Sequence, residues 1–393
     1  VFVDSMMLSG NGEIEVRVGD LISFNNQEAA RRQLQRPLET NKEFDWSSVG
    51  GLYTDAVERA RQRDYKGALE KYLACLAKDP LYTPALAGIA EVYYRRMEYT
   101  KGLEYARRAL ANDTYDPDAN FIYAVINKNL GNLYDALDGF GTAARSMKYR
   151  SAANAEMAEV AFLQKHWPAA EACAFRSLDY DRSNVRASRL LTVIYRAQRK
   201  TENAKEAIAH LKAIDPLSHL ANFENYMLDR SKENLDQFRS MIRSELPAES
   251  YLELASYYFG LKQYEEASLV LQQAPPHAMV SYWLAYLSDQ AKQPQKAGDY
   301  LARAIEQTSA FVFPFRQESA EILKWADAQK PHWKTKYYLA LLLWSKDRTD
   351  EAGNHFAACG NEPTFAAFYL ARGNFFKADQ SEVALRDYNR AME

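Results

Sequence analysis

Small residues recur along this chain at a constant interval, with larger apolar residues beside them. Counting forward from Ala68 in steps of 34 reaches Gly102, Ala136, Ala170 and Ala204. A parallel series stands 12 places earlier and comprises Ala56, Ala90, Ala124, Ala158 and Thr192. Two helices of about 12–15 residues joined by short turns need about 34 residues. The two series therefore predict helix pairs whose members cross closely at small side chains.

Larger apolar residues are placed to fill the space beside each predicted crossing. They stand one place before members of the earlier series: Ile89, Tyr123, Met157 and Leu191. A single helix pair cannot bury its own apolar face, so successive pairs must stack and share a core. The predicted fold is therefore all-α, a right-handed α-solenoid of helix pairs.

The segment 63–80, RDYKGALEKYLACLAKDP, carries a more specific signature. It combines Ala68, Tyr72, Cys75 and Pro80, and with its successors it resembles the tetratricopeptide repeat. The tryptophan usual in the first helix is absent, and the turn proline keeps its register only at Pro80. The resemblance implies a non-catalytic scaffold that binds a peptide or protein partner on the concave face of a superhelix.

The spacing divides the chain into three regions. Residues 45–218 hold about five regular repeats, whereas the register breaks after Ala204, because position 238 is Phe. Residues 219–247 are expected to form a shortened, irregular pair. Residues 219–393 continue as an irregular array, in which the spacing returns at Ala255 and Ala267, Ala285 and Ala297, Ala340 and Ala352, and in a last pair around Ala384, Tyr388 and Ala391. The third region, residues 1–44, precedes the repeats.

Two further elements lie outside the repeat pattern. An extra helix is predicted at about residues 315–329, between Pro314 and Pro331, because prolines commonly bracket helices. The segment 12–24, GEIEVRVGDLISF, alternates apolar and polar residues and predicts one or two strands. We expect this N-terminal β or extended segment either to lie against the first repeat or to be a remnant of, or linker to, an upstream domain.

A second resemblance covers about residues 43–345. The stretches FDWSSVGGLY, FVFPFRQES and HWKTKYYLALLLWS are similar to a bacterial family in which a sugar-enzyme-like β-sandwich precedes a tetratricopeptide array. The chain begins at Val1, and we expect it to be a piece of a longer protein. This resemblance implies an alternative role as an accessory or sugar-binding module of a carbohydrate-active protein. Any contact with carbohydrate would then come through the upstream domain.

Composition narrows the class of partner. The net charge is −3 over 393 residues, which does not favour a nucleic-acid partner. No apolar run approaches the ~20 residues that a membrane-spanning helix needs. Cys75, Cys173 and Cys359 are widely separated, so they form neither a disulfide framework nor a metal clip. Separated thiols favour a reducing compartment such as the cytoplasm, but the location stays open.

Motifs of known chemistry are absent from the sequence. It contains no phosphate-binding glycine loop, no zinc-binding pattern and no G-x-S-x-G elbow. The six histidines are scattered, and adjacent carboxylates such as Glu265 and Glu266 are expected on solvated helix faces. Cys75 and Cys359 occupy small-residue positions and are expected in the core. We therefore expect no catalytic residue, no cofactor and no metal site, and hence no enzyme.

The concave face of such an array is lined by the first helix of each pair. Residues three places before, or four or five places after, a member of the earlier small-residue series are expected to face the groove. The candidate partner-binding residues at such positions are Tyr53, Arg61, Tyr94, Arg95, Phe121, Lys128, Asn129, Arg189 and Arg196. Aromatic residues and Arg carry much of the binding energy at protein interfaces, so these positions suit an extended peptide or a helix. In the alternative interpretation, the aromatics only fill a tight superhelix.

Two further interpretations concern specificity. Tyr53 and Val57 occupy the places of the Lys and Asn of the carboxylate clamp in chaperone-binding repeats, so that clamp mechanism is not expected. The second half is rich in aromatic residues, which either pack between irregular repeats or offer a platform for sugar rings.

Overall fold

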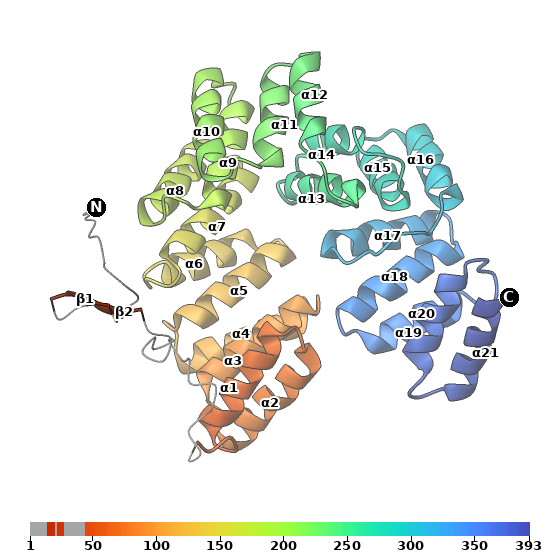
Figure 1. Cartoon of the computed structure of the whole chain (residues 1–393), viewed down its shortest axis with the longest axis horizontal. Coiled ribbons are helices and arrows are strands. Elements are labelled where there is room, and N and C mark those ends of the chain that lie inside the picture. Colours follow the sequence, from red (N-terminus) through yellow and green to blue (C-terminus); the bar gives the residue numbers. More distant parts are fainter. Residues whose placement is uncertain (1–13, 20–21, 27–43) are drawn as a thin grey trace.

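The helices of this protein stack into a curved array. The computed structural model describes residues 14–19, 22–26 and 44–393, which contain 21 helices and one two-stranded hairpin. Most helices form helix–turn–helix pairs, and successive pairs pack side by side (Figure 1). The array bends until residues 317–348 of its second half approach residues 96–99 of its first half. The predicted all-α solenoid of helix pairs is thus confirmed.

The first half of the array consists of five regular pairs. Their helices are α1 (Val49–Arg61), α2 (Tyr65–Lys78), α3 (Thr83–Arg95), α4 (Tyr99–Asn112), α5 (Pro117–Leu130), α6 (Leu133–Ala143), α7 (Arg150–Leu163), α8 (Trp167–Tyr180), α9 (Val185–Ala197) and α10 (Thr201–Ile214). Every residue of the two small-residue series is buried in these pairs. A Cβ on Gly102 would lie 3.1 Å from the carbonyl oxygen of Ala90. Small residues are therefore required where the two helices cross.

The second half begins with a short pair and is less regular. Its helices are α11 (His219–Leu228), α12 (Lys232–Ser240), α13 (Pro247–Gly260), α14 (Tyr264–Leu271), α15 (Ala278–Gln290), α16 (Pro294–Glu306), α17 (Gln317–Gln329), α18 (Trp333–Ser345), α19 (Thr349–Ala358), α20 (Ala366–Phe376) and α21 (Ser381–Met392). The extra helix predicted at 315–329 is α17, which begins at Gln317 and ends two residues before Pro331. None of the helices in the described residues combines the length and apolar character needed to cross a membrane.

The turn inside each regular pair contains one residue with a left-handed backbone. These residues follow the same interval of 34 and are Arg63, Met97, Gly131, Lys165 and Arg199, with φ values of 64°, 59°, 83°, 60° and 60°. This conformation costs a residue with a Cβ about 1 kcal/mol or more, and glycine adopts it freely. Gly131 is the one residue of the five whose type favours this conformation. Packing of the flanking helices must therefore stabilise the left-handed backbone in the other four turns.

The N-terminal hairpin confirms the predicted strands but not their expected packing. β1 (Glu15–Val18) pairs antiparallel with β2 (Ile22–Asn25), and Val16 faces Phe24 across the ladder. Val16, Val18 and Phe24 are exposed. These exposed side chains show no packing of their own against the first repeat, and the expected position of the whole segment stays a prediction. The remainder of residues 1–43 lies outside the described part of the chain.

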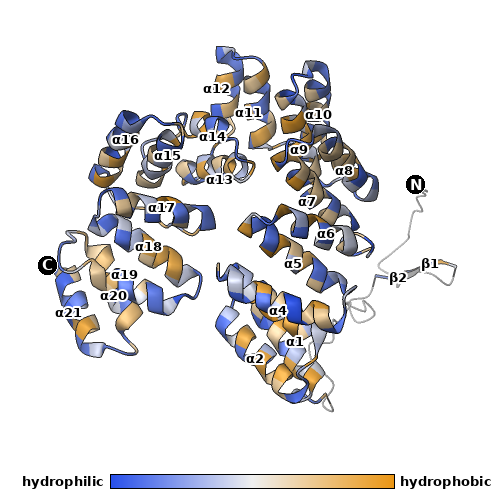
Figure 2. Ribbon diagram, turned by 180° about the vertical axis from the view of Figure 1, so that it is seen from behind, coloured by the Kyte–Doolittle hydropathy of each residue, from blue (hydrophilic) through white to orange (hydrophobic). Residues whose placement is uncertain are grey.

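Core packing differs between the two halves. Three small clusters of buried apolar residues serve the first pairs, and one of them centres on Phe140. A single large cluster extends from Ala158 to Tyr369. Figure 2 shows that hydrophobic residues recur on helices throughout the array rather than gathering in one place. This distribution is typical of a solenoid, in which each helix packs against its neighbours.

The first and last parts of the array touch each other, which we call the seam. It is formed by Arg96, Met97, Tyr99, Gln317, Asp347 and Arg348. The Arg96 Nη1 lies 3.3 Å from Asp347 Oδ2, and the Tyr99 hydroxyl donates to Gln317 Oε1 at 3.2 Å. The Arg348 Nη1 donates to the Met97 carbonyl oxygen at 3.4 Å. These polar contacts join the α3–α4 turn to α17 and the α18–α19 turn, so the array closes into a ring.

Candidate functional site

The first helices of the regular pairs face the interior of the ring. In Figure 1, α5, α7 and α9 lie on the inner side, whereas α6, α8 and α10 lie outside them. Their interior-facing side chains, together with those of α1, α3 and α13, make up what we call the inner face. Because the backbone groups in the middle of a helix are already hydrogen-bonded, a ligand on this face would be recognised mainly by side chains.

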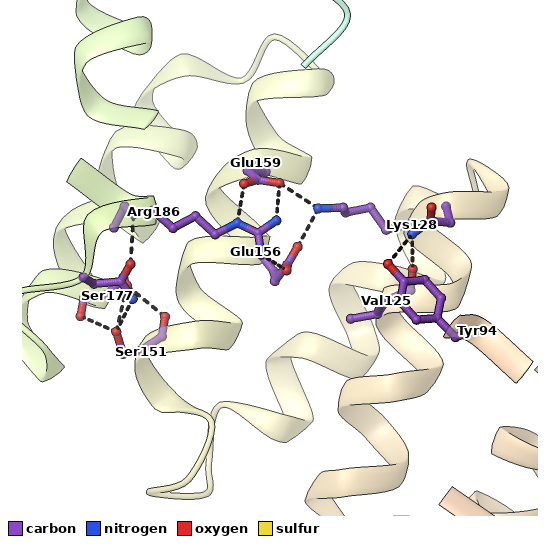
Figure 3. A network of polar contacts seen from close by, with 11 residues as sticks. Tyr94, Val125, Lys128, Ser151, Glu156, Glu159, Ser177 and Arg186 are labelled. Atoms are coloured by element: carbon purple, nitrogen blue, oxygen red, sulfur yellow. Dashed lines mark hydrogen bonds and ion pairs between the residues drawn. The ribbon is translucent and has the colours of Figure 1, made fainter. Parts of the chain in front are cut away.

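A network of ion pairs crosses the inner face from α5 to α9. Lys128 Nζ lies 2.5 Å from Glu156 Oε2 and 2.7 Å from Glu159 Oε2. Arg186 approaches the same two carboxylates from the other side, donating through Nε to Glu159 Oε1 at 2.5 Å and through Nη1 to Glu156 (Figure 3). These four residues, here called the first network, tie together three successive inner helices.

Electrostatics hold the first network in its charged form. Burial by itself would raise the pKa of the Glu159 carboxyl, but Lys128 and Arg186 outweigh this effect and lower that pKa to about 2. Burial would likewise lower the pKa of Lys128, and the charges of Glu159 and Glu156 raise it above its ordinary value. Two carboxylates and two cations thus compensate one another in a poorly solvated place.

A second network joins α9 to the irregular half. Arg196 Nε donates to Glu224 Oε2 at 2.6 Å, and its Nη1 donates to Glu266 Oε1 at 2.9 Å. The Tyr258 hydroxyl donates to the other oxygen of Glu224 at 2.6 Å. Glu266 was expected on a solvated face together with Glu265. That expectation is wrong for Glu266, because the curvature of the array brings α14 against the end of α9.

Two of the candidate binding residues are thus occupied by carboxylates of their own chain. The side chain of Lys128 is 16% exposed and that of Arg196 13% exposed. Both residues therefore stabilise the array, and a direct role for them in binding a partner stays a prediction. The acidic residues that pair with them, Glu156 and Glu224, did not stand out in the sequence, because they lie 28 residues from their partners.

Two of the candidate aromatics pack within the array. Tyr53 is half-buried, with its ring centroid 5.6 Å from that of Tyr82. Phe121 stacks on Tyr149 with centroids 4.4 Å apart. The interpretation in which aromatics fill a tight superhelix fits these two residues. Sequence reasoning missed the partner Tyr149, which precedes α7 and belongs to neither small-residue series.

Tyr94 is half-buried against Tyr99, with ring centroids 5.7 Å apart, whereas Arg61, Arg95 and Asn129 are exposed. Tyr94 and Asn129 come from adjacent repeats, and Asn129 Nδ2 donates to the Tyr94 hydroxyl at 3.4 Å. Arg95 is exposed and pairs with Glu91 on its own helix at 3.2 Å.

The two other arginines among the candidates make only long ion pairs. Arg61 lies 3.8 Å from Glu58, and Arg189 lies 3.4 Å from Asp215. The structure therefore brings Tyr94 and Asn129 together and leaves the side chains of Arg61, Arg95 and Arg189 within reach of a ligand.

The thiols and aromatics singled out in the sequence belong mostly to the core. Cys75 and Cys359 are buried, and burial raises the pKa of the Cys359 thiol to about 12, which leaves it protonated and unreactive. No group of three metal-ligating side chains occurs in the part of the chain that the structure describes. Among the aromatics of the second half, five that are completely buried are Tyr258, Tyr282, Trp283, Tyr338 and Phe368. These rings pack between repeats and offer no platform for sugars.

Comparison with known proteins gives similarity of fold. The model of a repeat family described as the TT21 fifth ARM repeats domain matches residues 56–162. No protein of curated description is similar by sequence. A tetratricopeptide repeat protein from Parabacteroides merdae shares 14% identity over 71% of this chain and 98% of its own, with a TM-score of 0.45. PilF of Pseudomonas aeruginosa shares 16% identity over 55% of this chain and 96% of its own, with a TM-score of 0.46.

A third similar structure is YrrB, described as a tetratricopeptide protein with an unusual peptide-binding site. It shares 18% identity over 45% of this chain and 91% of its own, with a TM-score of 0.39. At such identities and scores these similarities carry no information on ligands. The helix pairs of the chain itself define a tetratricopeptide-like helical solenoid, a fold that generally serves as a protein-interaction scaffold.

Proposed function

We propose that this tetratricopeptide-like solenoid is a non-catalytic scaffold that binds an extended peptide or protein segment along its inner face. The observation that carries the proposal is the set of accessible polar side chains at equivalent positions of successive inner helices. Arg61 on α1, Arg95 on α3 and Asn129 on α5 belong to this set, since they stand 34 residues apart, and Arg189 on α9 adds a cation at a different position of its helix. Arginine is among the residue types that carry binding energy at interfaces.

The closed ring restricts the kind of partner. An extended segment can follow the successive inner helices without opening the seam. Fixed networks on the inner face lower the entropic cost of ordering the binding side chains. We therefore expect a short linear segment rather than a globular domain as the bound element.

Selection from a peptide display library tests this proposal. The full chain is used as bait, and the affinities of selected peptides are measured by calorimetry. Exchanging Tyr94→Ala and Arg95→Ala together should weaken binding about 10-fold or more, as loss of interface anchors does. Tyr134→Ala is the control, because this side chain on the outer helix α6 is 85% exposed. Failure to select any binding peptide, or equal effects of both variants, would contradict binding on the inner face.

Support of an upstream carbohydrate-related domain stays a prediction of the sequence resemblance. No contact among the described residues bears on it.

A further inference from the structure

The left-handed turn inside a helix pair is occupied by one kind of residue more often than any other. The described part of the second half adds three such turn residues to those of the regular half, namely Lys262, Lys292 and Asp347, with φ values of 55°, 59° and 57°. Five of the resulting eight turn residues are basic: Arg63, Lys165, Arg199, Lys262 and Lys292. We call these five residues the basic edge.

The side chains of the basic edge are accessible to a ligand. All five residues are exposed, and none makes an ion pair or a side-chain hydrogen bond with another residue that the structure describes. Acidic residues beside these turns are already engaged, since Asp64 pairs with Arg59 at 2.8 Å and Glu202 with Lys205 at 2.9 Å. The cations of the basic edge are therefore left without a counter-charge.

The three turns that lack a cation differ from the others in a consistent way. Met97 and Asp347 belong to the seam, where both are half-buried and another turn contacts them. The third residue is Gly131, whose type suits the left-handed backbone. Each turn residue that is both exposed and not glycine is thus basic.

Folding alone gives little reason for a cation at this position. A positive charge after the last turn of a helix gains from the helix dipole, but the left-handed backbone costs a residue with a Cβ a similar amount. Glycine would avoid that cost. Recurrence of Arg and Lys at five turns of a chain with a net charge of −3 therefore points to a surface that attracts anions.

Contacts between pairs hold these turns along one edge of the array. Pairs pack side by side and each pair reverses the chain direction, so their first helices end at the same edge (Figure 1). Arg196 Nη1 donates to Glu266 Oε1 at 2.9 Å. Arg196 stands three residues before Arg199, and Glu266 four residues after Lys262. This ion pair therefore brings the α9–α10 turn beside the α13–α14 turn.

The basic edge is continuous with the inner face. Arg61 and Arg95 end α1 and α3, two residues before the left-handed turn residues, and their side chains are 75% and 54% exposed. Axes of packed helices lie about 8–10 Å apart, a distance that an extended chain covers with about three residues. A segment that follows the inner helices can thus present one side chain to each successive turn.

We propose that the basic edge selects an acidic peptide segment, with Asp or Glu recurring about every third residue, as the occupant of the inner face. A carboxylate carries the opposite charge and accepts hydrogen bonds from Lys and Arg. Exposed ion pairs are individually weak, so selection comes from several of them acting together. This inference rests on the proposed function, of which it names the charge of the partner.

The most informative variant combines Lys165→Gly, Arg199→Gly and Lys262→Gly. It removes three charges and gives each turn the residue type that its backbone favours, so the unfolding midpoint of the free chain should stay equal or rise. Affinity for a labelled peptide with Glu at every third position should fall about 10-fold.

The matched control combines Arg107→Gln, Arg176→Gln and Arg182→Gln. These exposed residues lie on the outer helices α4 and α8 and in the turn before α9, and their loss changes the net charge equally. Affinity of the control should change by less than about 2-fold. Unchanged affinity of the triple-glycine variant, or an equal loss in the control, would overturn the inference. A lower unfolding midpoint of the triple-glycine variant would show that the cations serve folding, which also counts against it.

The reverse change is Gly131→Lys, which adds a cation to the exposed turn that lacks one. Affinity for the Glu peptide should rise about 2-fold, as one exposed ion pair allows. The unfolding midpoint should fall, because lysine disfavours the left-handed backbone at φ 83°. A gain of affinity with a loss of stability would separate binding from folding, whereas unchanged or lower affinity would contradict the basic edge.

Other probes decide the class of partner. The same peptide with Gln in place of Glu should bind about 10-fold more weakly at low salt, and added salt should reduce this difference. Tighter binding of a single-stranded oligonucleotide or of phosphatidylserine vesicles than of the Glu peptide would overturn the choice of an acidic segment. Peptides selected by display should be enriched in Asp and Glu. Selected peptides without this enrichment would overturn the inference and leave the scaffold function standing, whereas selection of no peptide would count against the proposed function itself.

Discussion

The regular and irregular halves of this array solve the same packing problem differently. From α1 to α6, alanine and glycine stand at each crossing, and buried apolar residues form several small clusters. One extensive cluster begins in the last regular pairs, α7 to α10, and continues through the irregular half, where large rings such as Phe238 and Trp283 fill the space between pairs. The close crossing survives in both halves, since Ala255 and Ala267 are as buried as Ala56 and Ala68. The halves therefore differ in what lies between the pairs rather than within them.

This difference has a consequence for cooperativity. In a solenoid each pair interacts mainly with its neighbours, so stability is nearly a sum of local terms. A core cluster that joins many helices couples their unfolding more strongly. We expect the irregular half to unfold as a larger unit than any pair of the regular half.

The largest predicted effect comes from the aromatic cluster. Trp283→Ala should destabilise the irregular half by about 3–5 kcal/mol, because it leaves a large cavity and removes the hydrogen bond from the indole Nε1 to Ser319 Oγ. Phe140→Ala should have a comparable local cost in α6. Hydrogen exchange should show lost protection from α13 to α19 for Trp283→Ala and only around α5 to α7 for Phe140→Ala. Equally local losses in both variants would refute the contrast between the halves.

The next effect concerns the first network. The folded-state pKa of Glu159 is lower than its ordinary value of 4.5, so its charge stabilises the fold above pH 4.5. This contribution is lost as pH falls from 4.5 toward about 2. Glu159→Gln should cost about 3 kcal/mol at neutral pH, because it leaves buried cations uncompensated, and should flatten the pH dependence in that window. Urea denaturation across pH measures both effects. Glu202→Gln, at an exposed position of α10, is the control and should reproduce the wild-type profile.

Two glycines of α6 provide a matched test of whether a small residue is required where two helices cross. A Cβ on Gly139 would lie 2.9 Å from Ala124 Cβ, whereas a Cβ on Gly141 would meet nothing within 4 Å. Gly139→Ala should therefore destabilise the fold by about 1–3 kcal/mol through overpacking. Gly141→Ala should stabilise it by about 1 kcal/mol, because alanine favours the helix. Thermal unfolding of the two variants should shift in opposite directions, and shifts of the same sign would count against close crossing in this pair.

The smallest expected effect lies at the seam, where the two halves meet. Asp347→Asn removes the charge that faces Arg96 and should cost only about 0.5 kcal/mol, because the partial burial that raises the pKa of Asp347 offsets much of the attraction. Asparagine tolerates the left-handed backbone of this turn, at φ 57°, so the turn itself should be preserved. Small-angle scattering should show a larger radius of gyration if the ring opens. Asp350→Asn, at an exposed place on α19, should leave the radius unchanged.

How well each part of the fold could be predicted depends on how far apart along the sequence the interacting residues lie. The crossing residues, the break at Phe238 and the extra helix are local features, and each was predicted from spacing or flanking prolines. The left-handed turns were not, because four of the five regular ones carry Arg, Lys or Met rather than glycine. The stripe of Arg186, Arg189 and Arg196 along α9 was a usable signal of a charged inner face. Its acidic partners could not be named, since they lie on other helices.

The sequence by itself determined the helix pairs, because a small residue every 34 positions fixes where two neighbouring helices cross. Only the tertiary structure decided which inner side chains remain free. Small rotations between successive pairs add up around the ring, so they bring Glu266 to Arg196 across 70 residues and Gln317 to Tyr99 across 218. No periodicity encodes such encounters. As a result, Lys128 and Arg196 hold the array together, while Arg189 Nε and the Tyr257 hydroxyl find no acceptor among the described residues.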